Sequence, residues 1–342
     1  MGRLRVEDRI DIAPEKALQK AQTMFEAVGA PADVAKEVAH HLVEAEQSGV
    51  ASHGLVRVLQ YTREMRNGVL APMARPEVCE EDRGRLTVDA RGGIGIPAMR
   101  IAQEIAAERA SEKGLAVVAL LGAGHTGRLG AFGEIAARKG CLSITIGGGN
   151  RQNWRQVAPY GGRKALLPTN PYCIAMPGGE RGPVVVDIAT SQSAGGWIYA
   201  ARAAGVDLPE GLIIDREGHP SCDPEDYFKG GAILPKGGPL GYGMALIAEL
   251  IGEAMLGSVE KGEINWLILA LDCERYAPTG PMQAAAEEIL AELRQSEPAT
   301  GHDKVMIPGE RERDAWQSSQ GKPLSLSRQV WEAIETLSQE LA

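Results

Sequence analysis

The chain has 342 residues, 44% of them hydrophobic, and a formal net charge of −9 at pH 7. An acidic chain without a basic cluster repels a phosphate backbone, so we expect no nucleic-acid partner. The N-terminus is charged throughout and no apolar stretch approaches roughly 18 residues, so we expect neither a signal peptide nor a membrane span. Five widely spaced cysteines without a CxxC pair indicate reduced thiols and a cytoplasmic protein.

The first 80 residues have the periodicity of helices. Apolar residues recur at helical spacing over residues 14–28, 34–45 and 55–65. Pro14 is placed to open the first helix, and Gly29 is placed to end it. The sequence therefore begins with an all-helical segment.

From about residue 85 the sequence pattern changes from that of helices alone to that of alternating strands and helices. We expect a short strand at 86–88, a helix at 96–110, a buried strand at 115–121, a helix at 128–139 and a second buried strand at 141–146. Alternation of this kind predicts an α/β layer.

The second half is less regular. We expect strands at 172–176, 184–188 and 266–271, and helices at 189–204, 242–256, 281–295 and 324–341. The hydroxyls of Thr190 and Ser191 could cap the helix at 189–204 or bind the ribose and phosphate groups of a cofactor. Residues 205–240 are expected to be mainly loop.

Both chain ends share the helical texture. We therefore expect a discontinuous helical domain formed by residues 1–80 and 258–342, with a central α/β domain at 81–257 inserted in it.

Residues 52–57 carry the most informative short segment. His53 and Arg57 are four residues apart, so a helix places them on one face. An imidazole can exchange a proton near neutral pH, and a guanidinium can bind a carboxylate with two parallel hydrogen bonds. Ser52 could orient the ring. The alternative is a capped helix start with a surface His and Arg.

A glycine-rich loop follows the strand at 115–121. Gly122, Gly124 and Gly127 form a G-x-G-x-x-G pattern, but the next strand lacks the acidic residue that a Rossmann fingerprint expects. The loop is either a phosphate cradle or an ordinary βα turn. Arg128 could meet a 2′-phosphate or merely cap a helix, so NAD and NADP both stay open.

Metal chemistry is not indicated. The six histidines do not have metal-site spacing, and His41 lies with His40 on a helix without a carboxylate partner pattern.

Seven short motifs in order resemble the malate/L-lactate dehydrogenase family that is unrelated to the Rossmann-fold enzymes. Its members include ureidoglycolate dehydrogenase, diketogulonate reductase, sulfolactate dehydrogenase, piperideine-2-carboxylate reductase and hydroxycarboxylate dehydrogenase. The motifs are S-H-G-x-x-R, H-x-G-R-x-G, P-[WY]-G-G, T-N-P, D-x-A-T-S, a second glycine loop and P-G-E. They correspond to residues 52–57, 125–130, 159–162, 169–171, 187–191, 237–243 and 308–310.

The resemblance implies a mixed-sheet, non-Rossmann nicotinamide-binding domain and a homodimer. It implies His53 as the general acid/base, Ser52 as its partner and Arg57 as the carboxylate anchor, with Thr169 near the substrate. The residues it assigns to NAD or NADP are His125, Thr126, Gly127, Arg128, Leu129, Asp187, Ala189, Thr190, Ser191, Pro239, Leu240, Pro308, Gly309 and Glu310.

Two positions depart from the family pattern. Leu240 stands where the family usually has Lys, so a backbone contact would survive there but a charge contact would not. Trp197 stands where hydroxy-acid enzymes commonly have Lys and the imine reductase has Asp. Trp197 is therefore a candidate apolar wall of the substrate site.

These features predict an NAD(P)-dependent oxidoreductase that transfers a hydride between nicotinamide and C2 of a small 2-oxo or 2-hydroxy acid. Two alternatives stay open. One is a cyclic ketimine reductase, which reduces C=N. The other is a nucleotide-binding protein with little turnover.

Overall fold

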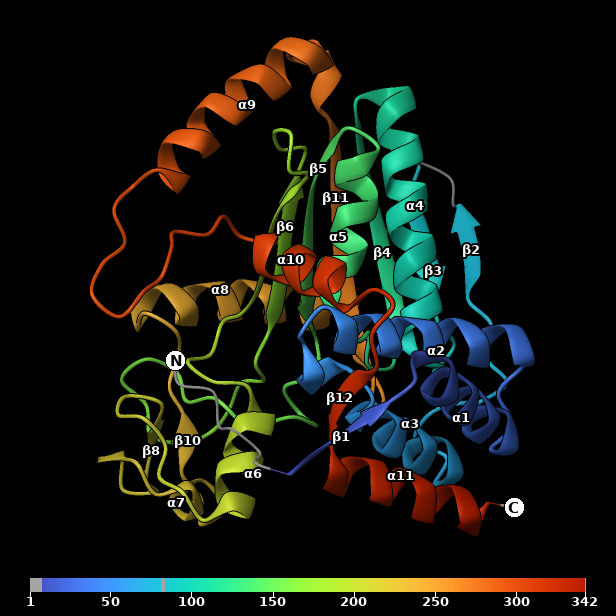
Figure 1. Ribbon diagram of the computed structural model, residues 1–342, viewed down its shortest axis with the longest axis vertical. Helices are drawn as coiled ribbons and strands as arrows, with labels where there is room; N and C mark the ends of the chain where they lie inside the picture. Colours follow the sequence, from blue (N-terminus) through green and yellow to red (C-terminus); the bar gives the residue numbers. More distant parts are fainter. Residues whose placement is uncertain (1–7, 81–83, 342) are drawn as a thin grey trace. The chain divides into compact units, whose positions relative to one another are not determined.

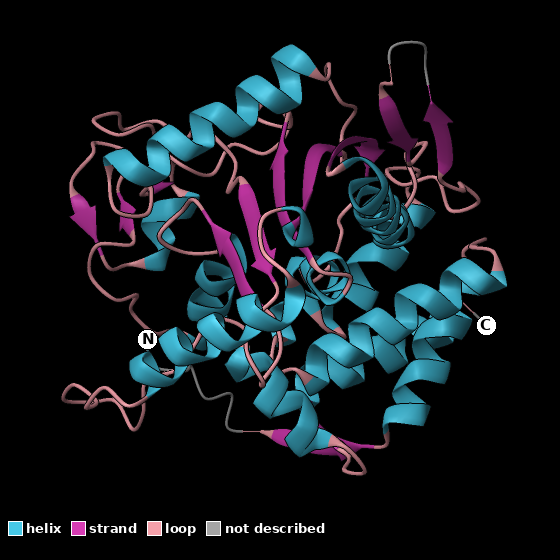
Figure 2. Cartoon of the chain, turned by 90° about the horizontal axis from the view of Figure 1, so that it is seen from above, coloured by secondary structure: helices cyan, strands magenta, loops and turns pink. Residues whose placement is uncertain are grey.

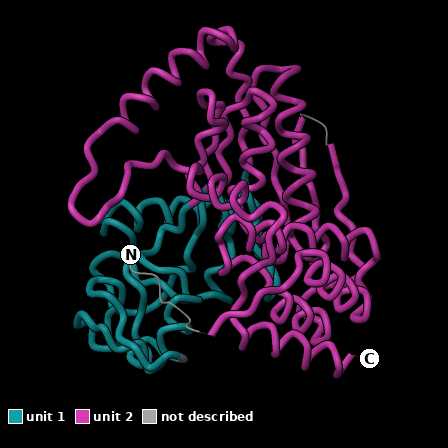
Figure 3. The backbone as a smooth tube through the Cα atoms, viewed as in Figure 1, with its two compact units in different colours: residues 1–5, 146–172, 188–267 teal, residues 6–145, 173–187, 268–342 magenta. Residues whose placement is uncertain are grey.

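The computed structural model describes residues 8–80 and 84–341. The chain forms two compact units (Figure 3). Among the described residues, unit 1 comprises 146–172 and 188–267, and unit 2 comprises 8–80, 84–145, 173–187 and 268–341. Each unit is described in turn below.

A seven-stranded mixed sheet is the largest sheet within the described ranges. Its order is β2 (Glu77–Glu80), β3 (Leu86–Asp89), β4 (Leu115–Ala123), β11 (Ile264–Asp272), β5 (Cys141–Gly148), β6 (Pro171–Met176) and β7 (Val184–Ala189). Strands β2 and β3 are antiparallel, whereas β3 and β4 are parallel, with Leu86 opposite Val118. Strand β11 separates β4 from β5, the strands on either side of the glycine-rich loop. The predicted mixed, non-Rossmann sheet is therefore confirmed.

Both chain ends build the helical layer of unit 2 (Figure 1). Helices α1 (Pro14–Ala27), α2 (Ala32–Gln47) and α3 (Val56–Arg66) come from the N-terminal part, and α11 (Arg328–Glu340) packs against α3. Strand β1 (Arg9–Ile12) pairs with β12 (Leu324–Ser327) in antiparallel register, with Ile12 opposite Leu324. Helix α10 (Glu310–Ser319) contacts α2.

The rest of unit 2 combines helices with the strands, which Figure 2 distinguishes by colour. Helix α4 (Gly95–Lys113) packs on β4, and α5 (Leu129–Arg138) packs on α4. Helix α9 (Thr279–Arg294) follows β11 through the short 3₁₀ turn Cys273–Arg275.

Unit 1 has its own apolar core. A three-stranded sheet of order β10 (Ala232–Ile233), β8 (Ile213–Ile214) and β9 (Pro220–Ser221) lies in it with α6 (Gly195–Ala204) and α7 (Pro224–Phe228). Its buried side chains include Val157, Leu167, Ile198, Ile213 and Ile233. Helix α8 (Pro239–Glu249) continues into a π-helical segment, Leu250–Met255.

Two element predictions are wrong in their bounds. The helix expected at 189–204 begins only at Gly195, because Ser191 pairs with Pro235 in an isolated bridge and Thr190 N–H donates to Thr169 O. The C-terminal helix expected from residue 324 begins at Arg328, because residues 324–327 form β12.

The segment expected to be mainly loop, 205–240, contains α7 and three two-residue strands. Strands β1 and β2 were not expected from the sequence. The domain boundaries at residues 80 and 257 stay a prediction; the compact units follow other limits and place residues 84–145 with both chain ends.

Candidate active site

A short turn between α2 and α3 brings Ser52, His53 and Arg57 together. The turn, Ala51–His53, is a single 3₁₀ segment. Ser52 Oγ lies 2.9 Å from His53 Nδ1, and Arg57 Nε donates to Ser52 O at 2.7 Å. Arg57 Nη1 also donates to Gln60 Oε1. The three predicted residues thus lie together, and the hydrogen bonds to Ser52 O and Gln60 fix the position of the Arg57 guanidinium.

The ring of His125 stacks on His53, with ring centroids 5.4 Å apart. Tyr61 Oη lies 2.5 Å from His125 Nδ1, and Gly127 N–H donates to the same nitrogen at 3.1 Å. A backbone amide can only donate, so Nδ1 carries no proton and the neutral ring bears it on Nε2. His125 is therefore a neutral donor beside His53.

The electrostatics of this region favour neutral imidazoles. Burial, followed by the positive charges of Arg57 and Arg128, lowers the pKa of His53 to about 4. Burial lowers the pKa of His125 far below its ordinary value, and Arg57 adds to the effect. No described residue is recorded as a hydrogen-bond partner of His53 Nε2. The Ser52 hydroxyl can donate to Nδ1 or accept from it, so the neutral His53 ring can carry its proton on either nitrogen.

His41 on α2 supports the loop that carries His125. Its Nε2 accepts the N–H of Arg128 at 2.9 Å, and its ring stacks on Phe132. Burial, with the charge of Arg128, lowers the pKa of His41 to about 3. The Arg128 guanidinium is buried and pairs with Glu44 at 3.1 Å.

Neither His41 nor Tyr61 was expected at the site from the sequence. Tyr61 lies four residues after Arg57, so helical spacing alone could have placed both on one face. For His41 no comparable signal exists, because its partner is a backbone amide far along the chain.

The loop at 125–130 is mostly buried in unit 2. Thr126, Arg128 and Leu129 are each at most 6% exposed. Gly127 has φ +70°, and a Cβ there would overlap His41 Nε2. Asp187, near the end of β7, accepts the Gly130 N–H at 2.7 Å. Asp187 therefore satisfies an amide in the first turn of α5.

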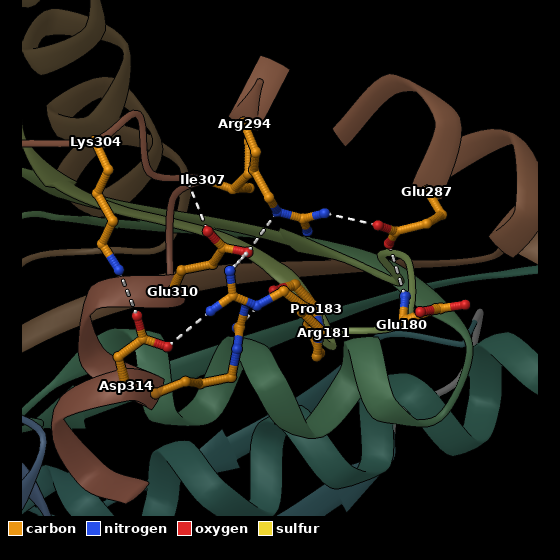
Figure 4. Close-up of polar contacts among 10 residues, drawn as sticks. Glu180, Arg181, Pro183, Glu287, Arg294, Lys304, Ile307, Glu310 and Asp314 are labelled. Atoms are coloured by element: carbon orange, nitrogen blue, oxygen red, sulfur yellow. Dashed lines mark hydrogen bonds and ion pairs between the residues drawn. The ribbon is translucent and has the colours of Figure 1, made fainter. Parts of the chain in front are cut away.

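The remaining predicted cofactor residues of unit 2 lie at the start of α10 (Figure 4). Glu310 is buried and accepts from Ile307 N at 3.1 Å and from Arg294 Nε at 2.9 Å, and Arg181 lies 3.4 Å away. Pro308 O accepts the Val185 N–H, and Gly309 precedes the first residue of α10. Both oxygens of the Glu310 carboxylate therefore already have partners within the protein.

Unit 1 holds the other predicted residues. Thr190 and Ser191 are buried, and their hydroxyls donate to Thr169 O and Ser193 O. Thr190 O accepts the Lys236 N–H at 2.8 Å. Pro239 and Leu240, which open α8, are exposed, and Trp197 in the first turn of α6 is 39% exposed. Ala189, the last residue of β7, is half-buried.

The described residues contain neither a metal-ion cluster nor a helix suited to crossing a membrane. No group of three or more His, Cys, Asp or Glu side chains there is arranged to hold a metal ion. No helix in the same residues has the length and apolar character that crossing a membrane requires.

Known proteins resemble this chain over nearly its whole length. Residues 12–335 match the family described as malate/L-lactate dehydrogenase. An L-lactate dehydrogenase from Cupriavidus necator is 34% identical, over 96% of this chain and 97% of its own. A Δ1-pyrroline-2-carboxylate/Δ1-piperideine-2-carboxylate reductase from Pseudomonas putida is 34% identical over 72% of this chain and 71% of its own.

A solved structure agrees with the sequence comparison. The sulfolactate dehydrogenase from Methanocaldococcus jannaschii has a TM-score of 0.85 and 28% identity, and the match covers 97% of each chain. The Ser52-His53-Arg57 turn, the mixed sheet and these likenesses lead to one conclusion: the chain belongs to the malate/L-lactate dehydrogenase family of oxidoreductases.

Proposed function

We propose that this oxidoreductase transfers a hydride reversibly between a nicotinamide cofactor and C2 of a small 2-oxo or 2-hydroxy acid. The observation that carries the proposal is the turn at 51–57. It holds a neutral imidazole and a guanidinium on one helical turn, with Ser52 in contact with both. A proton carrier beside a carboxylate-binding cation suits a substrate whose carboxylate adjoins the reacting carbon.

Each side chain of the turn has a role in this proposal. Arg57 binds the substrate carboxylate. His53 delivers a proton to the C2 oxygen during reduction and accepts it during oxidation. Ser52 engages Nδ1, which leaves Nε2 for the substrate. The nicotinamide, when bound, supplies or accepts the hydride.

Substrate binding should help His53 to hold its proton. The Arg57 charge is one of the causes of the low pKa of His53. A substrate carboxylate on Arg57 offsets that charge, so the pKa of His53 rises when the substrate binds.

The exposed groups around the start of α8 fit a dinucleotide. Lys236, which is exposed, is tied through its backbone to Thr190, and Pro239 opens the helix that follows. A cation and a helix N-terminus favour phosphate groups. We propose that these residues, with Ala189, Leu240 and the loop at 125–129, hold NAD or NADP. The buried Arg128 guanidinium already pairs with Glu44, which removes one reason to expect a 2′-phosphate contact there.

We also propose that the protein is a cytoplasmic homodimer. All five cysteines are free, which fits a reducing compartment. Helix α8 and the π-helical segment after it expose Leu246, Ile247, Leu250 and Met255. An exposed apolar stripe of this kind is typical of an interface between subunits.

A second candidate function is the reduction of a cyclic ketimine acid. The similarity to the Pseudomonas putida reductase favours it. The substrate carboxylate would bind Arg57 in the same way, and the choice between C=O and C=N would depend on side chains such as Trp197. If Trp197 is a wall of the site, Trp197→Ala should change the ratio of kcat/KM between substrates. An unchanged ratio would remove Trp197 from the substrate site.

The test follows the absorbance of NADH and of NADPH with a panel of 2-oxo acids and cyclic imines. We expect turnover with at least one 2-oxo acid, and a loss of about 100-fold or more in His53→Ala. Turnover with imines alone would select the second candidate. Cofactor binding without any turnover would overturn both and leave the nucleotide-binding alternative.

A further inference from the structure

Glu46 lies near the end of α2 and contacts the residues that follow His53. Its Oε1 accepts the N–H of Leu55 at 2.9 Å. Leu55 directly precedes the first residue of α3, so its amide belongs to the group of helix N-terminal donors that have no partner within the helix. The Glu46 side chain on α2 therefore supplies the hydrogen-bond acceptor for this amide at the start of α3.

Gly54 makes this contact possible. A Cβ on Gly54 would lie 2.5 Å from Glu46 Oε1 and 2.7 Å from its Cγ. The φ of Gly54 is −93°, which lies outside the left-handed region that favours glycine. The close approach of Glu46, and not a positive φ, is what excludes a side chain at this position.

We propose that Glu46 is a positioning residue for the proposed reaction. Its carboxylate accepts the Leu55 N–H and packs against Gly54, and these two contacts fix the position of the turn that carries His53. The proposal rests on the proposed function of His53. Its own evidence is the geometry of a carboxylate seated against the residue that follows His53.

The environment of Glu46 is costly for a carboxylate. Burial raises the pKa of Glu46 to about 7, although the Leu55 N–H and the charge of Arg9 on β1 lower it. Groups with a strongly perturbed pKa cluster at functional sites, which agrees with a place for Glu46 beside His53.

The test compares Glu46→Ala and Glu46→Gln, both as full-length enzyme. The Gln side chain keeps an oxygen acceptor for Leu55 N–H, whereas Ala removes it. In Glu46→Ala we expect kcat to fall about tenfold or more, because a displaced acid/base loses alignment. We expect Glu46→Gln to recover most of that loss, with the KM for the cofactor little changed in both. The matched control is Glu37→Gln, which removes a carboxylate of α2 that pairs with Arg100.

Amide hydrogen exchange tests the hydrogen bond between Leu55 N–H and Glu46 independently of any activity measurement. In Glu46→Ala the Leu55 amide should exchange about tenfold faster or more, and in Glu46→Gln it should stay protected. Unchanged Leu55 exchange in Glu46→Ala would overturn the proposal, and so would wild-type kcat in that variant. If the wild type turns over no substrate, the proposed function fails, and NMR signals of the His53 ring in the two variants still show whether Glu46 sets its position.

Gly54→Ala supplies a double-mutant cycle. The added methyl group displaces Glu46, so Gly54→Ala alone should lower kcat. In the Glu46→Ala background the space is free, and the same change should cost much less. Effects that simply multiply would show that the two residues act separately and would contradict the proposal.

Discussion

Backbone amides decide the protonation of two histidines in unit 2. The N–H of Arg128 faces His41 Nε2, and the N–H of Gly127 faces His125 Nδ1. Each amide needs a lone pair on the ring, so both rings are held neutral with a defined tautomer. His53 differs because its contact is a hydroxyl, which can donate or accept. Of the three rings, it is the one whose contacts allow both protonation states.

The pH dependence of the reaction should follow from this. The pKa of His53 is lowered to about 4, so the free enzyme is neutral there across the working range. Oxidation of the hydroxy acid needs neutral His53, so its kcat/KM should rise to about pH 4 and stay level above it. Reduction needs the protonated ring, so its kcat/KM should fall about tenfold per pH unit above pH 4.

Steady-state rates in both directions at constant ionic strength measure this profile. His53→Ala should flatten both curves. A level profile for reduction between pH 5 and 8 in the wild type would show that the proton enters with the substrate or from another group.

At the scale of elements, the loop before α5 is shaped by one glycine. Gly127 has a positive φ, and a Cβ there would also meet His41. Gly140 also has a positive φ, +85°, but a Cβ there would meet nothing within 4 Å. The two positions therefore separate backbone strain from the clash.

We expect Gly140→Ala to lower the free energy of unfolding by about 1 kcal/mol, the cost of a left-handed alanine. Gly127→Ala should lower it by about 2–4 kcal/mol, because the clash with His41 adds to the same strain. Urea unfolding of both variants measures the difference. Equal losses would mean that the loop moves away from His41 without cost.

The elements predicted well are those with long periodic signals. Helices α1 to α5 and the buried strands β4 and β5 lie within a few residues of their predicted positions. The short strand β12 was missed although Leu324 and Leu326 alternate with serines, because four residues before a strong helical pattern read as its continuation. The start of α6 was misplaced because the partners of Thr190 and Ser191 are distant in sequence.

In the candidate site, too, the residues close in sequence could be predicted and those with distant partners could not. Ser52, His53 and Arg57 share one turn, so their proximity followed from spacing. Tyr61 could have been added by the same argument. Glu46 and His41 act on backbone amides nine and 87 residues away, and a sequence pattern does not record such contacts.

At the scale of the whole molecule, the proposed homodimer can be tested on the stripe of α8. Ile247→Asp places a charge at an exposed apolar position there and should shift the protein toward monomer. Val206→Asp is the control, since Val206 is also exposed in unit 1 but lies outside the stripe. Sedimentation velocity measures the outcome. A wild type that sediments as a monomer would contradict the homodimer itself.

The pairing of β1 with β12 has a consequence for synthesis. Ile12 lies opposite Leu324, so the first strand of the helical layer meets its partner only after 312 further residues (324 − 12) have been made. At roughly 5–20 residues per second, the N-terminal strand waits about 15–60 s on the ribosome. During that time the face of α3 that α11 will cover is open to chaperones and to neighbouring chains. The candidate turn at 51–57 is made early, whereas the layer around it is completed only when β12 and α11 have been made.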